Sequence, residues 1–412
     1  MNIWYLSAYD QPKGQSPRTY IFSRELAKRG HRVTMFTNSY CHFTHTERLD
    51  PHEKWRIEEI DGIRVVWLRT IHYMGNGIGR GMNMVSNTRR AFQAARTFSD
   101  VPDVVIGPSV PLLCGWAAMK LAQWNGAAFV FEVRDVWPFA LAADGGISKN
   151  GPVYLAFRYI EKLLYRKAQR ISAVLPFIFD HVSQSGGDPK KVTWIPNGVD
   201  FERFDGFEAY DGGKDLPLVA MYVGGFGVSQ DVVSIVRAAG ILKEKGNDKY
   251  RFVLVGKGVT RPDCERKAAS LGLRNVEFRD PVPKRDVPRL QMEADLLIAA
   301  LIGTASFSFG MNSNKIYDYL ASGRPMIFSG RTPNDPATSS GAGFSVPPQD
   351  PEAMAGALER FLELSPGERI EMGKRGRQYV ERENDIPKLV ERMESLLAQA
   401  VEEGESGLRH GR

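Results

Sequence analysis

The feature that most constrains the fold is an alternation of short β-branched runs with helical stretches, repeated in two arrays along the 412 residues. Runs of this kind, each followed by a helix, are typical of parallel sheets covered by helices. A stretch rich in Asp and Gly at 201–216 separates the two arrays, as a linker would. Because the chain is also too long for one core, the sequence predicts an α/β protein with two Rossmann-like domains.

The expected domains are an N-terminal acceptor-side domain over residues 1–200 and a C-terminal domain over 201–386. A helix over 387–403 is expected to cross back to the first domain, and 404–412 to form a disordered tail. The expected strands are Ile3–Ser7, Arg32–Thr37, Ile63–Leu68, Val104–Ile106, Ala128–Val133, Ile171–Val174, Val192–Ile195, Leu218–Val223, Phe252–Val255, Val276–Phe278, Leu296–Ala299 and Met326–Phe328. Expected helices include Thr19–Arg29, Arg80–Arg96, Tyr154–Gln169, Val232–Lys245, Cys264–Leu271, Val287–Glu293 and Lys315–Ala321.

Composition indicates a soluble protein, because 43% apolar and 25% charged residues are ordinary values. The longest uncharged run, 104–119, is interrupted by two prolines and does not predict a membrane span. The N-terminal run lacks the basic start of a signal peptide. Three widely spaced cysteines favour a reducing compartment, so we expect a cytoplasmic protein.

The charge is distributed unevenly. Residues 1–203 carry 26 Lys and Arg against 18 Asp and Glu, whereas residues 204–412 carry 28 against 30. The first half is therefore the one expected to meet an anionic surface or ligand. No nucleic-acid module is recognisable, so an acidic membrane face or a diphosphate-linked acceptor fits better than nucleic acid.

One segment, 310–325, carries the strongest functional signal; it reads GMNSNKIYDYLASGRP. A helix that begins after an exposed glycine turn presents unpaired N–H groups and the positive end of its dipole to an anion. Lys315 adds a cation in the first turn. Asp318, one turn further on, could bind a hydroxyl next to a phosphate. A sugar nucleotide is the simplest ligand that needs all three features.

Two other strands end in candidate site residues. The expected strand Leu218–Val223 runs into glycines that let backbone N–H groups approach a phosphate: Gly224, Gly225 and Gly227. The expected strand Ala128–Val133 is followed by charges, which gather at ligand sites when they lie at a strand's carboxyl end. These are Glu132, Arg134 and Asp135; an ordinary buried Arg–Asp ion pair is the alternative.

No metal site is predicted. The group formed by Cys41, His42, His45 and His52 lacks a second close-spaced ligand pair, which favours a solvated loop. No Asp-x-Asp motif occurs, so a leaving diphosphate would be neutralised by the helix dipole, backbone donors and cations.

The chain resembles the retaining enzymes of glycosyltransferase family 4. Their nucleotide-binding helix carries two acids eight positions apart and ends in Ala-x-Gly-Lys/Arg-Pro. Here Asp318 stands at the second acid and 321–325 (ASGRP) fits the ending, while Gly310 replaces the first acid. The string 195–200 (IPNGVD) matches the family's interdomain hinge. The resemblance implies a GT-B fold, with two parallel sheets facing a central cleft.

Several departures from that family resemble its WbuB-like branch of O-antigen amino-sugar transferases. The family's Arg and Lys clamp on the diphosphate is replaced by Gly225 and Gln230, and Asn314-Lys315 precedes the helical acid. The string 132–138 (EVRDVWP) follows the branch's Glu-x-Arg-Asp-x-Trp-Pro pattern. We expect Lys315 to supply part of the missing clamp, helped by backbone N–H groups around 311–314.

The resemblance implies a set of site residues. The implied donor-binding residues are Gly14, Gly224, Gly225, Gly227, Gln230, Gly310, Met311, Asn312, Ser313, Asn314, Lys315 and Asp318. Those implied for catalysis are Arg134, Glu132, Asp135 and Lys315, and those on the acceptor side are Ser16, Arg18 and Trp137. Arg18 could instead simply face solvent.

The resemblance, together with the missing Asp-x-Asp motif, implies a retaining, metal-independent glycosyltransferase that needs no cofactor. It would move a sugar, expected to be an N-acetylamino sugar, from a UDP-sugar to a saccharide or polyprenyl-diphosphate-linked acceptor in bacterial surface polysaccharide synthesis. The basic helices Tyr154–Arg170 and Arg80–Arg96 could lie on an anionic membrane, although a core-facing helix with a solvated basic side explains the first equally well. A UDP-sugar 2-epimerase of the same fold and a non-catalytic partner subunit are the alternatives.

Overall fold

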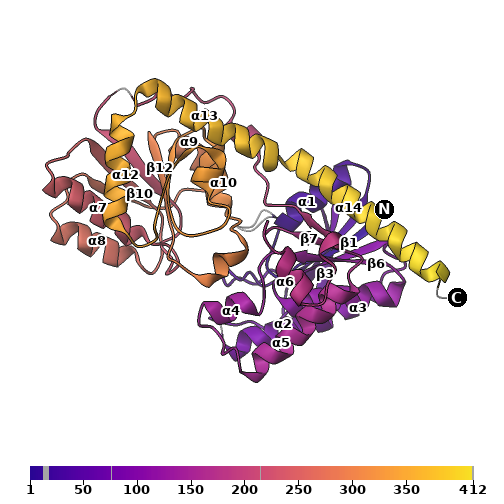
Figure 1. The fold of residues 1–412 in the computed structure, drawn as a ribbon. Helices are drawn as coiled ribbons and strands as arrows, with labels where there is room; N and C mark the ends of the chain where they lie inside the picture. Colours follow the sequence, from indigo (N-terminus) through magenta and orange to yellow (C-terminus); the bar gives the residue numbers. More distant parts are fainter. Residues whose placement is uncertain (13–17, 76, 214, 411–412) are drawn as a thin grey trace. The chain divides into compact units, whose positions relative to one another are not determined.

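The computed structural model describes residues 1–12, 18–75, 77–213 and 215–410. The chain divides into two compact units, unit 1 (Met1–Pro196 with Pro387–Arg412) and unit 2 (Asn197–Ile386). Each unit has its own sheet with helices packed against it (Figure 1). The prediction of two parallel α/β domains is confirmed.

Among the described residues, unit 1 holds an eight-stranded sheet in the order β3-β4-β2-β1-β5-β6-β7-β8. All neighbouring strands are parallel except β3, which pairs antiparallel with β4 at the edge. The strands are β1 (Asn2–Leu6), β2 (Arg32–Asn38), β3 (Trp55–Ile60), β4 (Ile63–Leu68), β5 (Val104–Pro108), β6 (Ala128–Val133), β7 (Arg170–Ala173) and β8 (Val192–Trp194).

The helices of unit 1 are α1 (Arg18–Lys28), α2 (Ile78–Ala95), α3 (Leu112–Asn125), α4 (Phe139–Ala143), α5 (Pro152–Lys167), α6 (Phe179–Gln184), the 3-10 turn η1 (Pro189–Lys191) and α14 (Ile386–His410). Helix α3 packs between α2 and α5, so these three form one layer. Figure 1 shows this layer on one side of the sheet and α1 with α14 on the other.

The C-terminal helix α14 returns to unit 1. The guanidinium of Arg29 lies 2.8 Å from Glu394, His31 lies 2.7 Å from the same carboxylate, and Arg170 pairs with Glu403. Residues 404–410, for which the sequence predicted a disordered tail, continue the helix. A Cβ at Gly404 would lie 3.6 Å from the Cβ of Ala128, so the glycine is an ordinary packing position and not a helix end.

Unit 2 has a fully parallel sheet, six-stranded within the same described ranges, in the order β11-β10-β9-β12-β13-β14. Its strands are β9 (Leu218–Val223), β10 (Tyr250–Val255), β11 (Val276–Arg279), β12 (Leu296–Ala300), β13 (Met326–Ser329) and β14 (Gly343–Val346). Alternate strand residues belong to two different cores: Tyr222 and Leu254 pack on one face, Met221 and Val253 on the other. A sheet buried on both faces is the expected pattern for parallel strands.

The helices of unit 2 divide between these cores. Helices α7 (Val232–Glu244), α8 (Arg261–Ser270) and α12 (Pro351–Glu363) supply the first, and α9 (Val287–Gln291), α10 (Asn314–Ala321), α11 (Pro336–Ser340) and α13 (Pro366–Glu383) the second. The 3-10 turns are η2 (Phe201–Phe204), η3 (Lys284–Asp286) and η4 (Ala305–Phe309). The Asp- and Gly-rich stretch after η2 packs onto this unit, since the Arg369 guanidinium donates to the carbonyls of Gly212 and Gly213.

Candidate functional site

Backbone hydrogen bonds to the end of β10 and the loop after it hold the glycine loop that follows β9. The Gly224 N–H donates to the Val255 carbonyl (3.0 Å), and the Phe226 N–H donates to the Lys257 carbonyl (2.9 Å). The Phe226 ring is fully buried and anchors the loop to the core. A Cβ added at Gly227 would meet open space, and one at Gly225 would only reach 4.0 Å from the Lys257 carbonyl oxygen. The loop therefore leaves room for a ligand beside its backbone.

A second glycine pair, Gly256 and Gly258 after β10, supports the first loop. A Cβ at Gly256 would lie 1.8 Å from the Gly224 carbonyl oxygen, and one at Gly258 would lie 2.3 Å from that of Phe226. Both have positive φ, 146° and 153°. Only glycine allows the two loops to approach so closely. This pair was not predicted from the sequence, although a strand followed by Gly-x-Gly repeats the pattern that identified the first loop.

Lys315 is brought to this loop from the first turn of α10, as the sequence predicted. Its ammonium nitrogen lies 2.5 Å from Gln230 Oε1 and 4.7 Å from the centre of the Tyr222 ring. A Cβ at Gly224 would lie 3.0 Å from the Lys315 Cδ, so that glycine makes space for the lysine. Desolvation lowers the pKa of Lys315 to about 7. Within the described part of the chain, Lys315 has no carboxylate partner.

Gly310 explains why the first acid of the family motif is absent. Its φ is 99°, a conformation that a Glu would adopt only with strain. Beyond it, the side chain of Asn334 clamps Met311: Oδ1 accepts from the Met311 N–H (2.7 Å) and Nδ2 donates to its carbonyl (2.8 Å). The expectation that the Met311 N–H contacts an anion is therefore wrong, because that donor is occupied.

The residues that follow Met311 differ in their hydrogen bonding. Asn312 Oδ1 accepts from the Asn197 N–H (2.9 Å), so this side chain holds the chain near the hinge string. Ser313 occupies the N-cap without a side-chain cap, and Asn314 is exposed. In the described structure the N–H groups of Asn314 and Lys315 have no recorded acceptor, which leaves them available to a ligand.

Asp318 lies in a cluster of charges. Its Oδ1 is 3.6 Å from an Arg203 nitrogen. Desolvation raises the pKa of Asp318, while Arg203 and Lys284 lower it and Asp200 raises it further. Arg203 and Lys284 were not predicted from the sequence, because no local motif links them to Asp318. Contact of Asp318 with a ribose stays a prediction.

In unit 1, Glu132 is fully buried beneath two arginines. Its Oε1 accepts from Tyr5 Oη (2.6 Å) and Arg18 Nε (2.9 Å), and its Oε2 accepts from Arg134 Nε (2.7 Å). Desolvation alone would raise its pKa, but Arg134, Arg18 and Tyr5 outweigh it and hold the pKa at about 2. Glu132 is therefore ionised and shielded from water.

Arg134 has an acidic partner that the sequence did not reveal. Its guanidinium donates to Asp10 Oδ2 (2.7 Å) and Thr19 Oγ1 (2.6 Å), and Asp10 also accepts from the Thr19 N–H (2.9 Å). The ion-pair alternative is thus present, but with Asp10 and Glu132 in place of Asp135. Arg18 does not face solvent: it is buried and donates to the carbonyls of 195 and 196 (2.8 and 2.7 Å).

Asp135 and Trp137 lie at the edge of this network. Asp135 is exposed. The buried ring of Trp137 stacks on Phe157 of α5 (6.4 Å) and lies under the guanidinium of Arg80 of α2 (5.6 Å), which also covers the Tyr9 ring (5.2 Å). Two other predicted contacts, Gly14 and Ser16, lie outside the described residues.

The cysteine and histidine group of the second strand's loop forms aromatic contacts. His42 Nδ1 hydrogen-bonds Tyr73 Oη (2.5 Å) and His45 Nδ1 hydrogen-bonds Tyr40 Oη (2.9 Å). Over the described ranges, no three His, Cys, Asp or Glu side chains gather as they would around a metal ion. In the same ranges no helix is long and apolar enough to cross a membrane.

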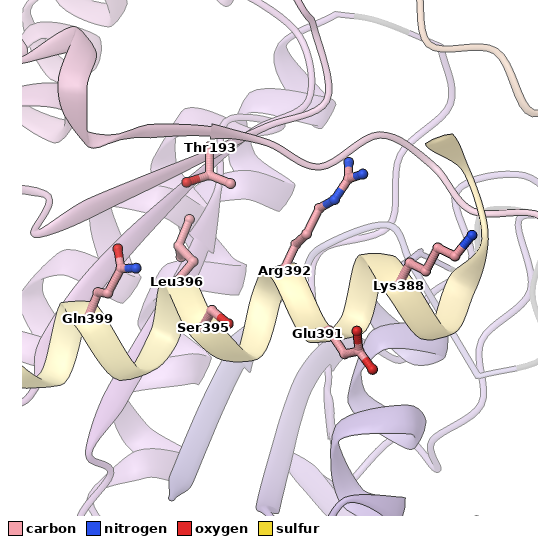
Figure 2. A pocket seen from close by; sticks show the side chains of 7 residues that line it. All are labelled: Thr193, Lys388, Glu391, Arg392, Ser395, Leu396 and Gln399. Atoms are coloured by element: carbon pink, nitrogen blue, oxygen red, sulfur yellow. The ribbon is translucent and has the colours of Figure 1, made fainter. Parts of the chain in front are cut away.

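Two cavities lie away from these residues. One, of about 460 Å³, lies between β8 and α14 in unit 1. Figure 2 shows the residues that line it: Thr193, Lys388, Glu391, Arg392, Ser395, Leu396 and Gln399. The other, about 370 Å³ in unit 2, lies beside Tyr210, Gly323 and Arg377. Neither is lined by a residue that the sequence assigned to the site.

Comparisons with known proteins agree with this arrangement. Residues 13–198 match the model of the glycosyl transferase 4-like domain, and residues 217–364 match that of glycosyl transferases group 1. A putative colanic acid biosynthesis glycosyl transferase, WcaI of Escherichia coli K12, is 23% identical over 87% of this chain and 90% of its own length.

Among solved structures, a sucrose-phosphate synthase of Thermosynechococcus elongatus superposes with a TM-score of 0.73 at 17% identity, covering 97% of this chain and 98% of its own. Anabaena HepE in complex with UDP gives 0.70 at 13% identity, covering 97% and 100%. Two domain models in the order of the two units, with similarity in fold over nearly the whole length, identify the chain as a GT-B-fold glycosyltransferase built from a glycosyl transferase 4-like domain and a group 1 domain.

Proposed function

We propose that the protein is a retaining, metal-independent glycosyltransferase that transfers a sugar from a UDP-sugar to a saccharide or lipid-linked acceptor. The observation that carries the proposal is the position of Lys315. A desolvated lysine without a carboxylate partner in the described structure stands between a glycine loop and a helix start. A partly buried lysine whose ammonium group is desolvated is costly to keep charged unless an anion completes its environment.

The donor's diphosphate is the anion that these groups suit. The ammonium group of Lys315, the N–H groups of Asn314 and Lys315 and the open backbone at Gly225 and Gly227 supply donors in one place. Gln230 holds the ammonium group until the phosphate replaces it. Stabilising charge where it develops on a leaving group is a large part of enzymatic catalysis.

The reaction follows from this placement. The acceptor oxygen attacks C1 of the sugar on the face that the diphosphate leaves, and the C1–oxygen bond to the β-phosphate breaks. The bond's electron pair passes to the phosphate oxygen, which takes the proton of the acceptor hydroxyl. Lys315 and the helix start stabilise the charge on the diphosphate during the step, so no divalent cation is required.

The chemical identity of the donor rests on similarity. HepE, which shares the fold, is described in complex with UDP, and WcaI is named for colanic acid biosynthesis. We therefore assign UDP as the nucleotide and bacterial surface polysaccharide as the pathway class. The resemblance to the amino-sugar branch, carried by Gln230 and Asn314-Lys315, favours an N-acetylamino sugar.

In unit 1 we propose a division of roles. Arg134, anchored by Asp10, Thr19 and Glu132, presents its guanidinium at the strand ends, and Glu132 acts through it as a positioning residue. Asp135 is accessible to an acceptor and Trp137 forms an apolar wall beside it. Arg18 fixes Glu132 from the other side.

The test is product analysis. The protein is incubated with UDP-N-acetylglucosamine and a short-chain polyprenyl-diphosphate sugar, in EDTA, and the products are examined by mass spectrometry and NMR. We expect a disaccharide lipid whose new linkage keeps the anomeric configuration of the donor. An inverted linkage, or a requirement for added Mg²⁺ or Mn²⁺, would contradict the mechanism. Release of an epimerised UDP-sugar without acceptor would instead identify a 2-epimerase.

A further inference from the structure

The helix layer α2–α3–α5 of unit 1 is unusual in its charge. Together the three helices contain eight Lys and Arg residues and a single acid, Glu161. Glu161 is buried and already paired with Arg158 and His181. The outer surface of the layer therefore carries positive charge that no carboxylate of its own helices balances.

Four cations toward the C-terminal ends of these helices lack a carboxylate partner among the described residues. Arg89 of α2, Lys120 of α3 and Arg166 and Lys167 of α5 are exposed. In the described structure none of the four contacts a carboxylate. On the opposite side of the sheet, by contrast, α14 pairs its acids with Arg29, His31 and Arg170.

Apolar side chains cover the other end of the same surface. Ile78, Met82 and Val85 follow one another at helical spacing on α2, and Ile78 is 86% exposed. Leu155 and Tyr159 do so on α5, and Tyr159 is 70% exposed. Isolated exposed apolar residues are common, but a spaced set on neighbouring helices marks an interaction surface.

The apolar end lies on the acceptor side of unit 1. Each helix returns the chain from the carboxyl end of one parallel strand to the start of the next, so the N-termini of α2 and α5 lie at the carboxyl edge of the sheet. Trp137 confirms this placement, because it contacts Arg80 of α2 and Phe157 of α5. The exposed Ile78, Met82, Leu155 and Tyr159 therefore flank the candidate acceptor residues.

We propose that the outer face of α2, α3 and α5 docks on a bilayer that contains anionic phospholipids. Apolar and aromatic side chains enter the interface while lysines and arginines contact headgroup phosphates, which is the pattern of helices that lie on a membrane. A nucleic acid would match the basic residues but not the exposed Ile78, Met82 and Leu155. The proposal concerns unit 1 alone; only its purpose, meeting a lipid-linked acceptor, rests on the proposed function.

Vesicle sedimentation tests this surface directly. The full chain is mixed with vesicles of phosphatidylcholine, with or without phosphatidylglycerol, at low and raised salt. We expect binding to the anionic vesicles only, weakened by salt. The triple variant Arg89→Glu, Arg166→Glu, Lys167→Glu should bind about 100-fold more weakly, since each basic residue near the surface contributes about a factor of five.

Two further variants complete the design. Lys28→Glu, Arg32→Glu, Lys388→Glu makes the same charge change on exposed positions outside the layer and should bind anionic vesicles like the wild type. Met82→Ser, Leu155→Ser, Tyr159→Ser should also lose binding, although its charge is unchanged. Circular dichroism and UDP affinity check that each variant is folded.

Three outcomes would overturn the proposal: no binding of the wild type to anionic vesicles, equal losses in both charge variants, or binding to duplex DNA without binding to vesicles. Transfer to a water-soluble short-chain acceptor separates this proposal from the enzymatic one. It should be unchanged in the layer variants, whereas failure of the proposed activity would abolish transfer in every variant and leave vesicle binding intact.

Discussion

At the scale of single residues, Lys315 is the central residue of the proposed donor site. Replacing it by Met keeps the aliphatic stem and removes the charge. A charge-assisted hydrogen bond contributes about 1.5–3 kcal/mol, so we expect kcat/KM to fall roughly 10- to 100-fold. Steady-state kinetics measure the loss, and Lys374→Met, at an exposed lysine of α13, is the control. Equal kinetics of Lys315→Met and the wild type would remove Lys315 from the site.

The lowered pKa of Lys315 predicts a pH dependence. With a pKa of about 7 in the free protein, the amine is charged below that pH and neutral above it. A diphosphate favours the charged form, so UDP affinity should fall as pH rises from 7 to 9, with proton uptake on binding. Calorimetry in buffers of different ionisation enthalpy measures that uptake. Lys315→Arg, which stays charged, should bind with little pH dependence; a flat wild-type profile would contradict the assignment.

For Glu132 the prediction concerns the stability of the fold and not the binding of the donor. Glu132→Gln leaves Arg18 and Arg134 facing a neutral group in a buried site, a change that costs about 3 kcal/mol. The pKa of Glu132 is lowered from 4.5 to about 2. The ionised carboxylate therefore stabilises the fold fully above pH 4.5, and this contribution is lost as the pH falls from 4.5 to about 2. Urea unfolding measures the difference, and Glu59→Gln on the exposed edge strand is the control. UDP affinity should not change.

At the scale of elements, the sequence predicted most strands because parallel strands buried on both faces form continuous apolar runs. The expected 63–68, 128–133 and 218–223 coincide with β4, β6 and β9. It missed β3 (WRIEEI), whose alternating exposed residues belong to an edge hairpin, and β14 (GFSV), which contains a glycine and lies at the other sheet's edge. A local apolar pattern reveals a strand only where its residues are buried. The edge strands β3 and β14 are the least buried, so the sequence did not reveal them.

The candidate site was predictable only in part for a related reason. Gln230, Lys315 and the first glycine loop are visible as motifs, and the structure brings them together. Asp10, Asn334 and Arg203 are not, since each meets its partner through the tertiary fold and no local spacing identifies it.

The paired glycine loops provide a test at this scale. In Gly256→Ala the new methyl group would overlap the Gly224 carbonyl and push the first loop away from Lys315. We expect weaker UDP binding, by at least about tenfold if one phosphate contact is lost. Gly356→Ala in α12, where a Cβ meets nothing within 4 Å, is the matched control and should bind normally. Normal binding by Gly256→Ala would show that the loop does not contact the donor.

At the scale of the whole molecule, the two units have separate cores, and our proposal gives them separate tasks. The described residues of the proposed donor site all belong to unit 2, and the acceptor groups and the basic helix layer to unit 1. Hydrogen exchange should therefore show that UDP slows exchange in the loops after β9 and β10 and at the start of α10. Protection confined to unit 1 would contradict this division.

The most direct test of the central claim, a metal-free UDP site built around Lys315, is calorimetric titration of the protein with UDP and then GDP in EDTA. The account predicts that UDP binds in EDTA with the affinity seen in Mg²⁺, that GDP binds more weakly, and that Lys315→Met loses most of the UDP affinity. Absence of UDP binding, or binding that appears only with a divalent cation, would contradict it.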